Sequence, residues 1–363
     1  PNPMTARTLR FLALAALLFI VSCHSGDGSS DAPPLFSARL VKSVDAVDLE
    51  KRLKAELTRR YERQYTSFLY WGNPMGGGGD VAVAGGESQP PTNNPTMDGG
   101  NADTSYSETN VQERGVDEGD LVKTDGAYIY LARGTHFFVL KANPAVETAL
   151  VSDTDLREPI NELYLANNLV TVITTSYSYP VMTGFAGSVA SSRSGPVTRL
   201  YTYDVSTAAT PTLTASIDFP GTLRGSRRIN TDIYLIINHT IDIPSPVSLW
   251  DYLNPGSFYD RDAYMRAREQ ALAENLKRIE EATLDDLLPA YTVTLSTAGT
   301  PSASPAISYD GIYIPEFGNG TDLSLVVRLD IAGPVPLIAA TSGVLSSWCS
   351  VYMSPESLYL TSD

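Results

Sequence analysis

Apolar and polar positions alternate through much of the chain after residue 108, which is the pattern of half-buried β-strands. One short unit recurs five times in this region: a polar turn followed by an apolar strand core, usually with Tyr at its centre. A repeated strand unit buries its apolar face only against its neighbours, so the repeat predicts stacked sheets. The five centres are Tyr128, Val170, Tyr234, Tyr313 and Tyr359, at spacings of 42, 64, 79 and 46 residues.

The spacings predict the blades of a β-propeller. The two short spacings match four-stranded blades, and the two long ones predict blades that carry insertions. We expect a mainly β fold: an incomplete propeller of about four blades plus the start of a fifth. Because propellers usually close their ring with at least four complete blades, we expect either a truncated sequence or an open arc with exposed edges. The expected blades lie at residues 116–150, 156–218, 222–300 and from 307, and a fifth begins at 347–362.

A second internal repeat supports this scheme. Residues 200–213 and 325–337 each read as a strand that ends in an Asp-initiated turn and is followed by Pro before the next strand. The Asp residues are Asp204 and Asp330, and a carboxylate at such a turn accepts backbone hydrogen bonds. We therefore interpret both as structural residues.

Two segments have helical periodicity instead. Residues 260–288 predict a helix inserted into the propeller, and residues 45–71 predict an amphipathic helix with Lys and Arg on its polar face. Glu50, Glu56 and Glu62 dilute that positive charge, so packing on the domain is favoured over lying on a membrane. The apolar face of the 45–71 helix consists of Val47, Leu49, Leu53, Leu57, Tyr61 and Phe68.

The first residues indicate export. Arg7 and Arg10 precede an apolar run over 11–21 that is too short to span a bilayer, so residues 1–22 predict a signal peptide. The run ends in Ile-Val-Ser-Cys23, which resembles the lipobox of bacterial lipoproteins. The resemblance implies cleavage before Cys23 and acylation of Cys23, which places the protein on the cell envelope. His24 follows the cysteine instead of Asp, so the outer membrane is expected where the host has one; an ordinary secretory signal is the alternative.

Polar, Gly- and Pro-rich composition predicts a tether over 23–44 and a disordered linker over 72–107. With Cys23 acylated, Cys349 has no partner for a disulfide, and we expect it to be a small buried residue. The net charge of −15 argues against nucleic acid and against electrostatic attraction to an anionic membrane surface.

The stretch 109–130 reads TNVQERGVDEGDLVKTDGAYIY. It resembles the opening motif of a family of secreted bacterial and archaeal proteins with a C-terminal β-propeller distantly related to WD-40 repeats. The resemblance extends to the last residue, so it implies a propeller domain over 108–363 that is cut short at its C-terminal end. It implies no particular reaction. The signature residues are Gly115, Val116, Asp117, Glu118, Asp120, Lys123 and Asp125.

The signature contains three carboxylates within four residues, and carboxylates are ligands that Ca²⁺ prefers. Their spacing is not that of an EF-hand, and Lys123 offsets the charge. We favour a structural turn, in which Asp117 or Glu118 can pair with Lys123, and expect no cofactor; a calcium site is the alternative.

No motif in the chain identifies a reaction. The three histidines, His24, His136 and His239, lack metal-ligand spacing, and neither a nucleophile elbow nor a phosphate loop is present. We therefore expect a non-enzymatic binding or scaffold module that contacts a protein or an extracellular ligand. Its likeliest contact elements are the insertions at 177–196 and 250–288, because function concentrates in loops on a rigid scaffold. The alternatives are a hydrolase of envelope polymers with an acidic site at the propeller channel and a calcium-stabilised scaffold.

Overall fold

The structure is a computed structural model that describes residues 40–67, 115–177, 195–254, 256–257, 260–316, 320–346 and 350–361. The predicted signal peptide, Cys23, His24, the linker over 72–107 and Cys349 lie outside the described residues, as does most of the loop over 177–196.

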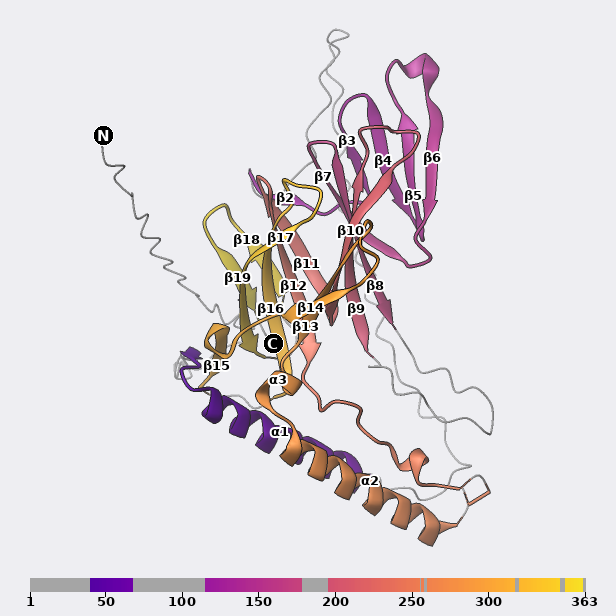
Figure 1. The fold of residues 1–363 in the computed structure, drawn as a ribbon. Helices are drawn as coiled ribbons and strands as arrows, with labels where there is room; N and C mark the ends of the chain where they lie inside the picture. Colours follow the sequence, from indigo (N-terminus) through magenta and orange to yellow (C-terminus); the bar gives the residue numbers. More distant parts are fainter. Residues whose placement is uncertain are drawn as a thin grey trace, which may run out of the picture.

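The strands form four sheets, which stand side by side in Figure 1. The first is a four-stranded antiparallel meander in which every strand pairs with the next in the sequence. It consists of β3 (Val122–Thr124), β4 (Tyr128–Arg133), β5 (His136–Lys141) and β6 (Ala149–Asp155).

The second sheet contains another four-stranded meander, and a hairpin from later in the chain extends it beyond its fourth strand. The meander is β7 (Ile160–Ala166), β8 (Leu169–Tyr177), β9 (Pro196–Asp204) and β10 (Thr212–Pro220). The added hairpin is β13 (Ala290–Leu295) and β14 (Ser302–Pro305).

The third sheet has the same four-stranded unit with short strands added on both sides. The unit is β11 (Thr222–Ile229), β12 (Asp232–Thr240), β16 (Asp322–Asp330) and β17 (Leu337–Leu345). The added strands are β2 (Asp117–Glu118) beside β11, and β15 (Ile312–Pro315) and β1 (Leu40–Lys42) beyond β17. The fourth sheet is the hairpin of β18 (Ser350–Met353) and β19 (Leu358–Thr361).

These sheets confirm a mainly β, propeller-like fold, but the expected number of blades is wrong. β12 pairs with β16 from Asp232↔Asp330 to Thr240↔Asp322, so residues 222–240 and 322–345 belong to one sheet. The expected third and fourth blades are therefore one blade with residues 241–321 inserted between its second and third strands. Within the described residues the chain forms three four-stranded blades and the first hairpin of a fourth.

Four of the five repeated units occupy equivalent places. The units of Tyr128, Val170, Tyr234 and Tyr359 lie on β4, β8, β12 and β19, each the second strand of a hairpin. Tyr313 is different, because its strand β15 runs parallel to β17 at the outer side of the third sheet. The Asp-turn repeat, by contrast, marks true equivalents, since Asp204 and Asp330 each end a third strand.

The apolar faces of neighbouring sheets pack against each other. One buried cluster joins the first and second sheets, through residues such as Phe137, Val139, Leu163 and Val172. A larger cluster joins the second sheet, the third sheet and the helices. Each sheet thus covers the apolar face of the next, as stacked blades require.

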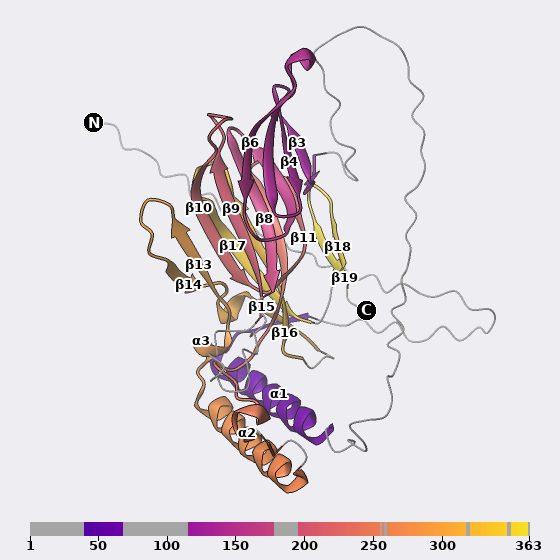
Figure 2. The ribbon, with the colours of Figure 1, turned by 90° about the vertical axis from the view of Figure 1, so that its right-hand side faces the viewer.

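The helices form a layer at one end of the molecule (Figures 1 and 2). They are α1 (Ala46–Ser67), α2 (Arg261–Glu281) and α3 (Leu284–Leu287). Leu49, Leu53 and Leu57 of α1 are fully or almost fully buried, so this helix packs on the domain. Among the described helices, none is long and apolar enough to cross a membrane. Residues 40–42, which we expected to be tether, instead form β1 and pair with β15.

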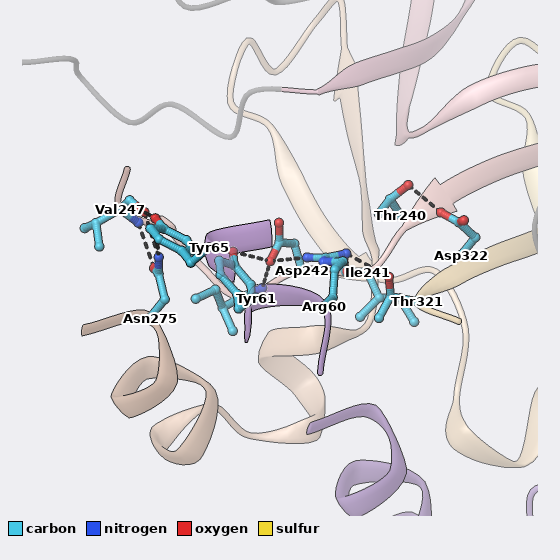
Figure 3. Close-up of polar contacts among 11 residues, drawn as sticks. Arg60, Tyr61, Tyr65, Thr240, Ile241, Asp242, Val247, Asn275, Thr321 and Asp322 are labelled. Atoms are coloured by element: carbon cyan, nitrogen blue, oxygen red, sulfur yellow. Dashed lines mark hydrogen bonds and ion pairs between the residues drawn. The ribbon is translucent and has the colours of Figure 1, made fainter. Parts of the chain in front are cut away.

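Polar contacts hold α1 against the third sheet (Figure 3). The Arg60 guanidinium donates to the Ile241 carbonyl at 3.0 Å and to Thr321 Oγ1 at 2.7 Å, and it pairs with Asp242 at 2.7 Å. The hydroxyl of Tyr61 donates to Asp242 Oδ1 at 2.8 Å. Ile241 and Thr321 lie at the ends of the large insertion, so α1 fastens the two points where that insertion leaves the blade. We call these contacts the α1 clamp.

Candidate functional site

The signature segment lies where the inner edges of three sheets meet. β2 pairs with β11 of the third sheet, and Asp120 forms a β-bridge with Leu163 on β7 of the second sheet. The chain then continues directly into β3 of the first sheet. The segment over 117–124 therefore contacts all three complete blades in the described chain.

Two ion pairs connect β2 to β11. Asp117 Oδ2 lies 2.8 Å from Arg228 Nη2, and Glu118 Oε1 lies 3.2 Å from Arg227 Nη2. The register places each acid directly opposite its own arginine. Successive side chains of a strand point to opposite faces, so one ion pair lies on each face of the pairing between β2 and β11.

Lys123 brings the first sheet into the same arrangement. Its side chain is only 8% exposed, and its Nζ donates to Asp117 Oδ1 at 2.8 Å and to the Glu118 carbonyl at 2.8 Å. The ammonium also lies 5.6 Å from the ring centre of Tyr164, a cation–π distance. A buried lysine needs such partners because an unpaired charge away from water is costly.

Glu162 and Ser226 lie close to these ion pairs. The Ser226 hydroxyl donates to Glu162 Oε1, and the Tyr164 hydroxyl is hydrogen-bonded to Ser226 Oγ at 2.5 Å. Burial raises the pKa of Glu162, although the Ser226 hydrogen bond and the charges of Arg227 and Lys123 oppose the shift. Burial, followed by the Glu162 charge, also raises the pKa of Tyr164. We call the whole set the signature cluster: Asp117, Glu118, Lys123, Glu162, Tyr164, Ser226, Arg227 and Arg228.

The remaining signature residues shape the backbone around the cluster. Gly115 has φ of +91°, which side-chain-bearing residues rarely adopt, and Val116 is buried. The Asp120 carboxylate accepts the Leu121 N–H at 2.6 Å. Asp125 accepts the backbone N–H groups of the β3–β4 turn and, through Oδ2, the Tyr130 hydroxyl at 2.9 Å.

The contacts of the signature cluster connect the first, second and third sheets at their inner edges, and we call this connection the lock. In the part of the chain that the structure describes, no group of three His, Cys, Asp or Glu side chains is arranged to hold a metal. The carboxylates of Asp117 and Glu118 face cations, and Glu162 is hydrogen-bonded to Ser226. The signature carboxylates Asp117 and Glu118 are thus engaged with cations of the protein itself.

Sequence reasoning reached Asp117, Glu118 and Lys123 but missed the other five members of the signature cluster. Glu162, Tyr164, Ser226, Arg227 and Arg228 lie far from the signature in sequence, and strand pairing brings them to it. The sequence contained one signal for these residues: Arg227 and Arg228 are consecutive in a strand. Their side chains point to opposite faces, so each of the two charges needs an acidic partner.

The two described histidines lie elsewhere. His136, on the β4–β5 hairpin, has its Nδ1 2.6 Å from Asp153 Oδ1, and this hydrogen bond raises the pKa of the exposed imidazole. His239 lies on β12 opposite Leu323. Neither is among the residues of the signature cluster.

A concave surface of about 330 Å³ lies between α1 and the third sheet. Its charged lining includes Arg52, paired with Asp48 at 2.7 Å, and Arg59, paired with Glu56 at 2.6 Å. Four of its charged lining residues are therefore engaged in ion pairs with one another.

The stacked blades and the locked inner edge define a β-propeller protein. A family model described as "Beta propeller domain" matches residues 106–363, and the chain belongs to this family. The chain is also similar to an uncharacterised protein of Methanocaldococcus jannaschii, with 26% identity over 155 residues, or 41% of this chain. The match covers 21% of that relative's length, so the relative is much longer than the shared part. No solved structure matches the chain.

Proposed function

We propose that the protein is an envelope lipoprotein whose propeller is a binding and scaffold module, held at the membrane by an acylated Cys23. The lipobox-like Ile-Val-Ser-Cys23 supports the anchor. The family membership supports a binding or scaffold role, since propellers present loops and faces on a rigid ring.

The observation that carries this proposal is the α1 clamp. Helix α1 is the first helix among the described residues, and Arg60 and Tyr61 attach it to the loops of the third sheet. Its buried leucines belong to the same core cluster as the second and third sheets. Because α1 is packed into the core of the domain, a lipid at Cys23 would keep the whole domain close to the membrane.

The signature cluster supports a scaffold in preference to a hydrolase. A hydrolase of envelope polymers needs an acid and a base that can reach the substrate. At the inner edge, Asp117 and Glu118 are neutralised by Lys123, Arg228 and Arg227. Glu162 is half-buried and accepts the Ser226 hydroxyl, and Asp120 accepts the Leu121 N–H.

Part of the insertion at 250–288, which we expected to contact a partner, is buried against the rest of the protein. Ala267, Ala271 and Asn275 of α2 are buried in the helical layer, and Asn275 exchanges hydrogen bonds with Val247 at 2.9 and 2.7 Å. Among the described residues of this insertion, a partner would contact the outer face of α2 and the exposed residues 250–252.

Metabolic labelling tests the anchor, and the two cysteines provide a matched pair of variants. Host cells expressing the wild type, Cys23→Ser or Cys349→Ser are grown with labelled palmitate, and the N-terminal peptide is analysed by mass spectrometry. We expect label in the wild type and in Cys349→Ser, a peptide that begins at acylated Cys23, and no label in Cys23→Ser. An unlabelled wild type, or label that persists in Cys23→Ser, would overturn the proposal.

A further inference from the structure

We infer that an exposed apolar patch at the start of the described fold lies in the headgroup region of the bilayer that holds the lipid at Cys23. We call it the elbow patch and define it as Val41, Val44, Val47 and Tyr309. The inference rests on the proposed function and adds to it the face that the protein turns toward the membrane.

Three valines are exposed within seven residues. Val41 on β1 is 49% exposed, Val44 after it is 84% exposed, and Val47 at the start of α1 is 74% exposed. The next apolar residue of α1, Leu49, is completely buried, so the helix turns Leu49 into the core and leaves Val47 outside. A single exposed apolar side chain is ordinary, whereas a group of them marks a contact surface.

Tyr309 joins the valines from far along the chain. It is 38% exposed on η4 (Tyr309–Gly311), a short helix that packs beside α1. The Ser43 N–H donates to the Ile312 carbonyl at 2.8 Å, which holds the turn after β1 against the end of η4. Since β1 is also paired with β15, folded backbone presents the patch. Tyr, with an apolar ring and a hydroxyl, favours the headgroup region of bilayers.

Three carboxylates close to the patch in sequence have partners within the protein. Asp45 Oδ1 accepts the Val47 N–H at 2.9 Å. Asp48 pairs with Arg52 at 2.7 Å, and Asp310 accepts the hydroxyl two residues before it. A bilayer at the patch therefore leaves none of these three carboxylates without a partner. Because the net charge of −15 is repelled by anionic lipid, the contact depends on burial of apolar surface and not on charge.

The length of chain before the described fold indicates which surface covers the patch. This chain enters the fold at Leu40, directly before Val41, and the distance from Cys23 to Leu40 is at most about 60 Å when extended. Along the chain, the elbow is the described surface nearest to the proposed lipid. The tether raises the effective concentration of the bilayer at the patch, so a contact of modest affinity is populated.

Fluorescence quenching at position 44 tests the contact. In a Cys349→Ser background, acylation of Cys23 leaves Val44→Cys as the single free thiol, and this thiol is labelled with bimane. The matched control carries Val146→Cys, because Val146 is 93% exposed on η2 (Ala145–Glu147), which lies at the opposite end of the molecule from β15 and the helices (Figure 1). Both full-length proteins are purified from the host and reconstituted in phosphatidylcholine vesicles that contain spin-labelled phospholipid.

We expect quenching and a blue shift of the label at position 44, and little change at position 146. Val41→Ser/Val47→Ser should weaken the contact about tenfold. A tether that only keeps position 44 near the bilayer would leave the quenching unchanged in this variant, and that result overturns the inference. Equal quenching at both positions, or none at position 44, also overturns it. A blue shift without quenching by lipid means that protein covers the patch, and overturns the inference as well.

The mass of the N-terminal peptide in the same samples separates the two proposals. Acylated Cys23 with an unquenched label at position 44 overturns the membrane contact and leaves the anchor standing. An unmodified Cys23 overturns the anchor. The Cys23→Ser form of the labelled protein is then mixed with the vesicles, and the contact stands if position 44 is quenched and falls if it is not.

Discussion

Gly119 lies directly against the carboxyl group of Glu162: a Cβ at position 119 would stand 2.1 Å from Glu162 Oε2 and 2.8 Å from Glu162 Cβ. The close approach lets the signature segment cross the inner edge of the second sheet. It also couples the backbone of the signature to the buried hydrogen bonds of Glu162, Ser226 and Tyr164.

Gly119→Ala should therefore destabilise the protein. The Glu162 side chain is half-buried and hydrogen-bonded, so its movement away from a new Cβ costs free energy, and we expect a loss of about 1–3 kcal/mol in the free energy of unfolding. Urea denaturation followed by circular dichroism measures it. Gly225→Ala is the matched control, because a Cβ at position 225 meets nothing within 4 Å. Equal stabilities of the two variants would show that the contact with Glu162 is not tight.

Glu162 should make stability depend on pH in a defined direction. Burial raises its pKa above the ordinary value of 4.5 for a glutamate, so the native state binds a proton more tightly than the unfolded state. The contribution of Glu162 to the free energy of unfolding is then fully present below about pH 4.5, and it decreases as the pH rises through the pKa of the native state. Glu162→Gln should flatten this decrease, and its stability relative to the wild type should improve as the pH rises through that window.

Urea denaturation at a series of pH values between 4 and 8 measures the difference between the two proteins. Glu269→Gln, at an exposed position on α2, serves as the control and should follow the wild type. A wild type and Glu162→Gln with parallel profiles would contradict the burial of this carboxyl group.

The α1 clamp should contribute to global stability. Tyr61→Phe removes the hydrogen bond to Asp242 and should cost about 1 kcal/mol. Arg60→Ala should cost more, because it leaves the Ile241 carbonyl, Thr321 and Asp242 without their shared donor. Thermal unfolding and limited proteolysis of α1 report both effects. Arg52→Ala removes only an exposed pair with Asp48 and should change stability by less than about 0.5 kcal/mol.

A chelator should leave the melting temperature unchanged. Asp117 and Glu118 are neutralised by protein cations, and the carboxylates of Asp120 and Asp125 accept hydrogen bonds within the protein, so a calcium ion would have to displace these partners. Differential scanning calorimetry with excess EDTA and with added Ca²⁺ tests this. A melting temperature that falls with EDTA and recovers with Ca²⁺ would favour the calcium-stabilised scaffold.

Local patterns in the sequence predicted much of the fold. The leucine stripe of α1 identified the face that is buried, and the turns before Tyr128, Val170, Tyr234 and Tyr359 identified four blade hairpins. Each of these features depends on neighbouring residues, which a single sequence displays directly.

Features that depend on long-range pairing were not accessible. The unit at Tyr313 has the same local pattern as the others, but pairing with β1 and β17 makes it an outer strand of an existing blade. Between β12 and β16 lies an insertion that contains two helices and a hairpin. No local sequence pattern predicts that the two strands pair across it. The partners of Lys123 were visible within the signature, whereas Arg227 and Arg228 became partners only through the register of β2 on β11.

The signature residues fasten three blades to one another. Asp117 contacts Lys123 of the first sheet and Arg228 of the third, and Lys123 is almost completely buried. Asp117→Asn removes the negative charge that Lys123 and Arg228 share and leaves Lys123 with neutral partners such as the Glu118 carbonyl and the Tyr164 ring, so it should cost about 3 kcal/mol. Asp232→Asn, in the more exposed pair with Arg328, should cost less than about 1 kcal/mol.

A double-mutant cycle on Asp117→Asn and Lys123→Met, measured by urea denaturation, tests the lock most directly. We predict a coupling energy of about 1–3 kcal/mol, with the double variant much more stable than the two single losses would suggest. A coupling energy near zero, with additive losses, would contradict a lock formed by these two side chains.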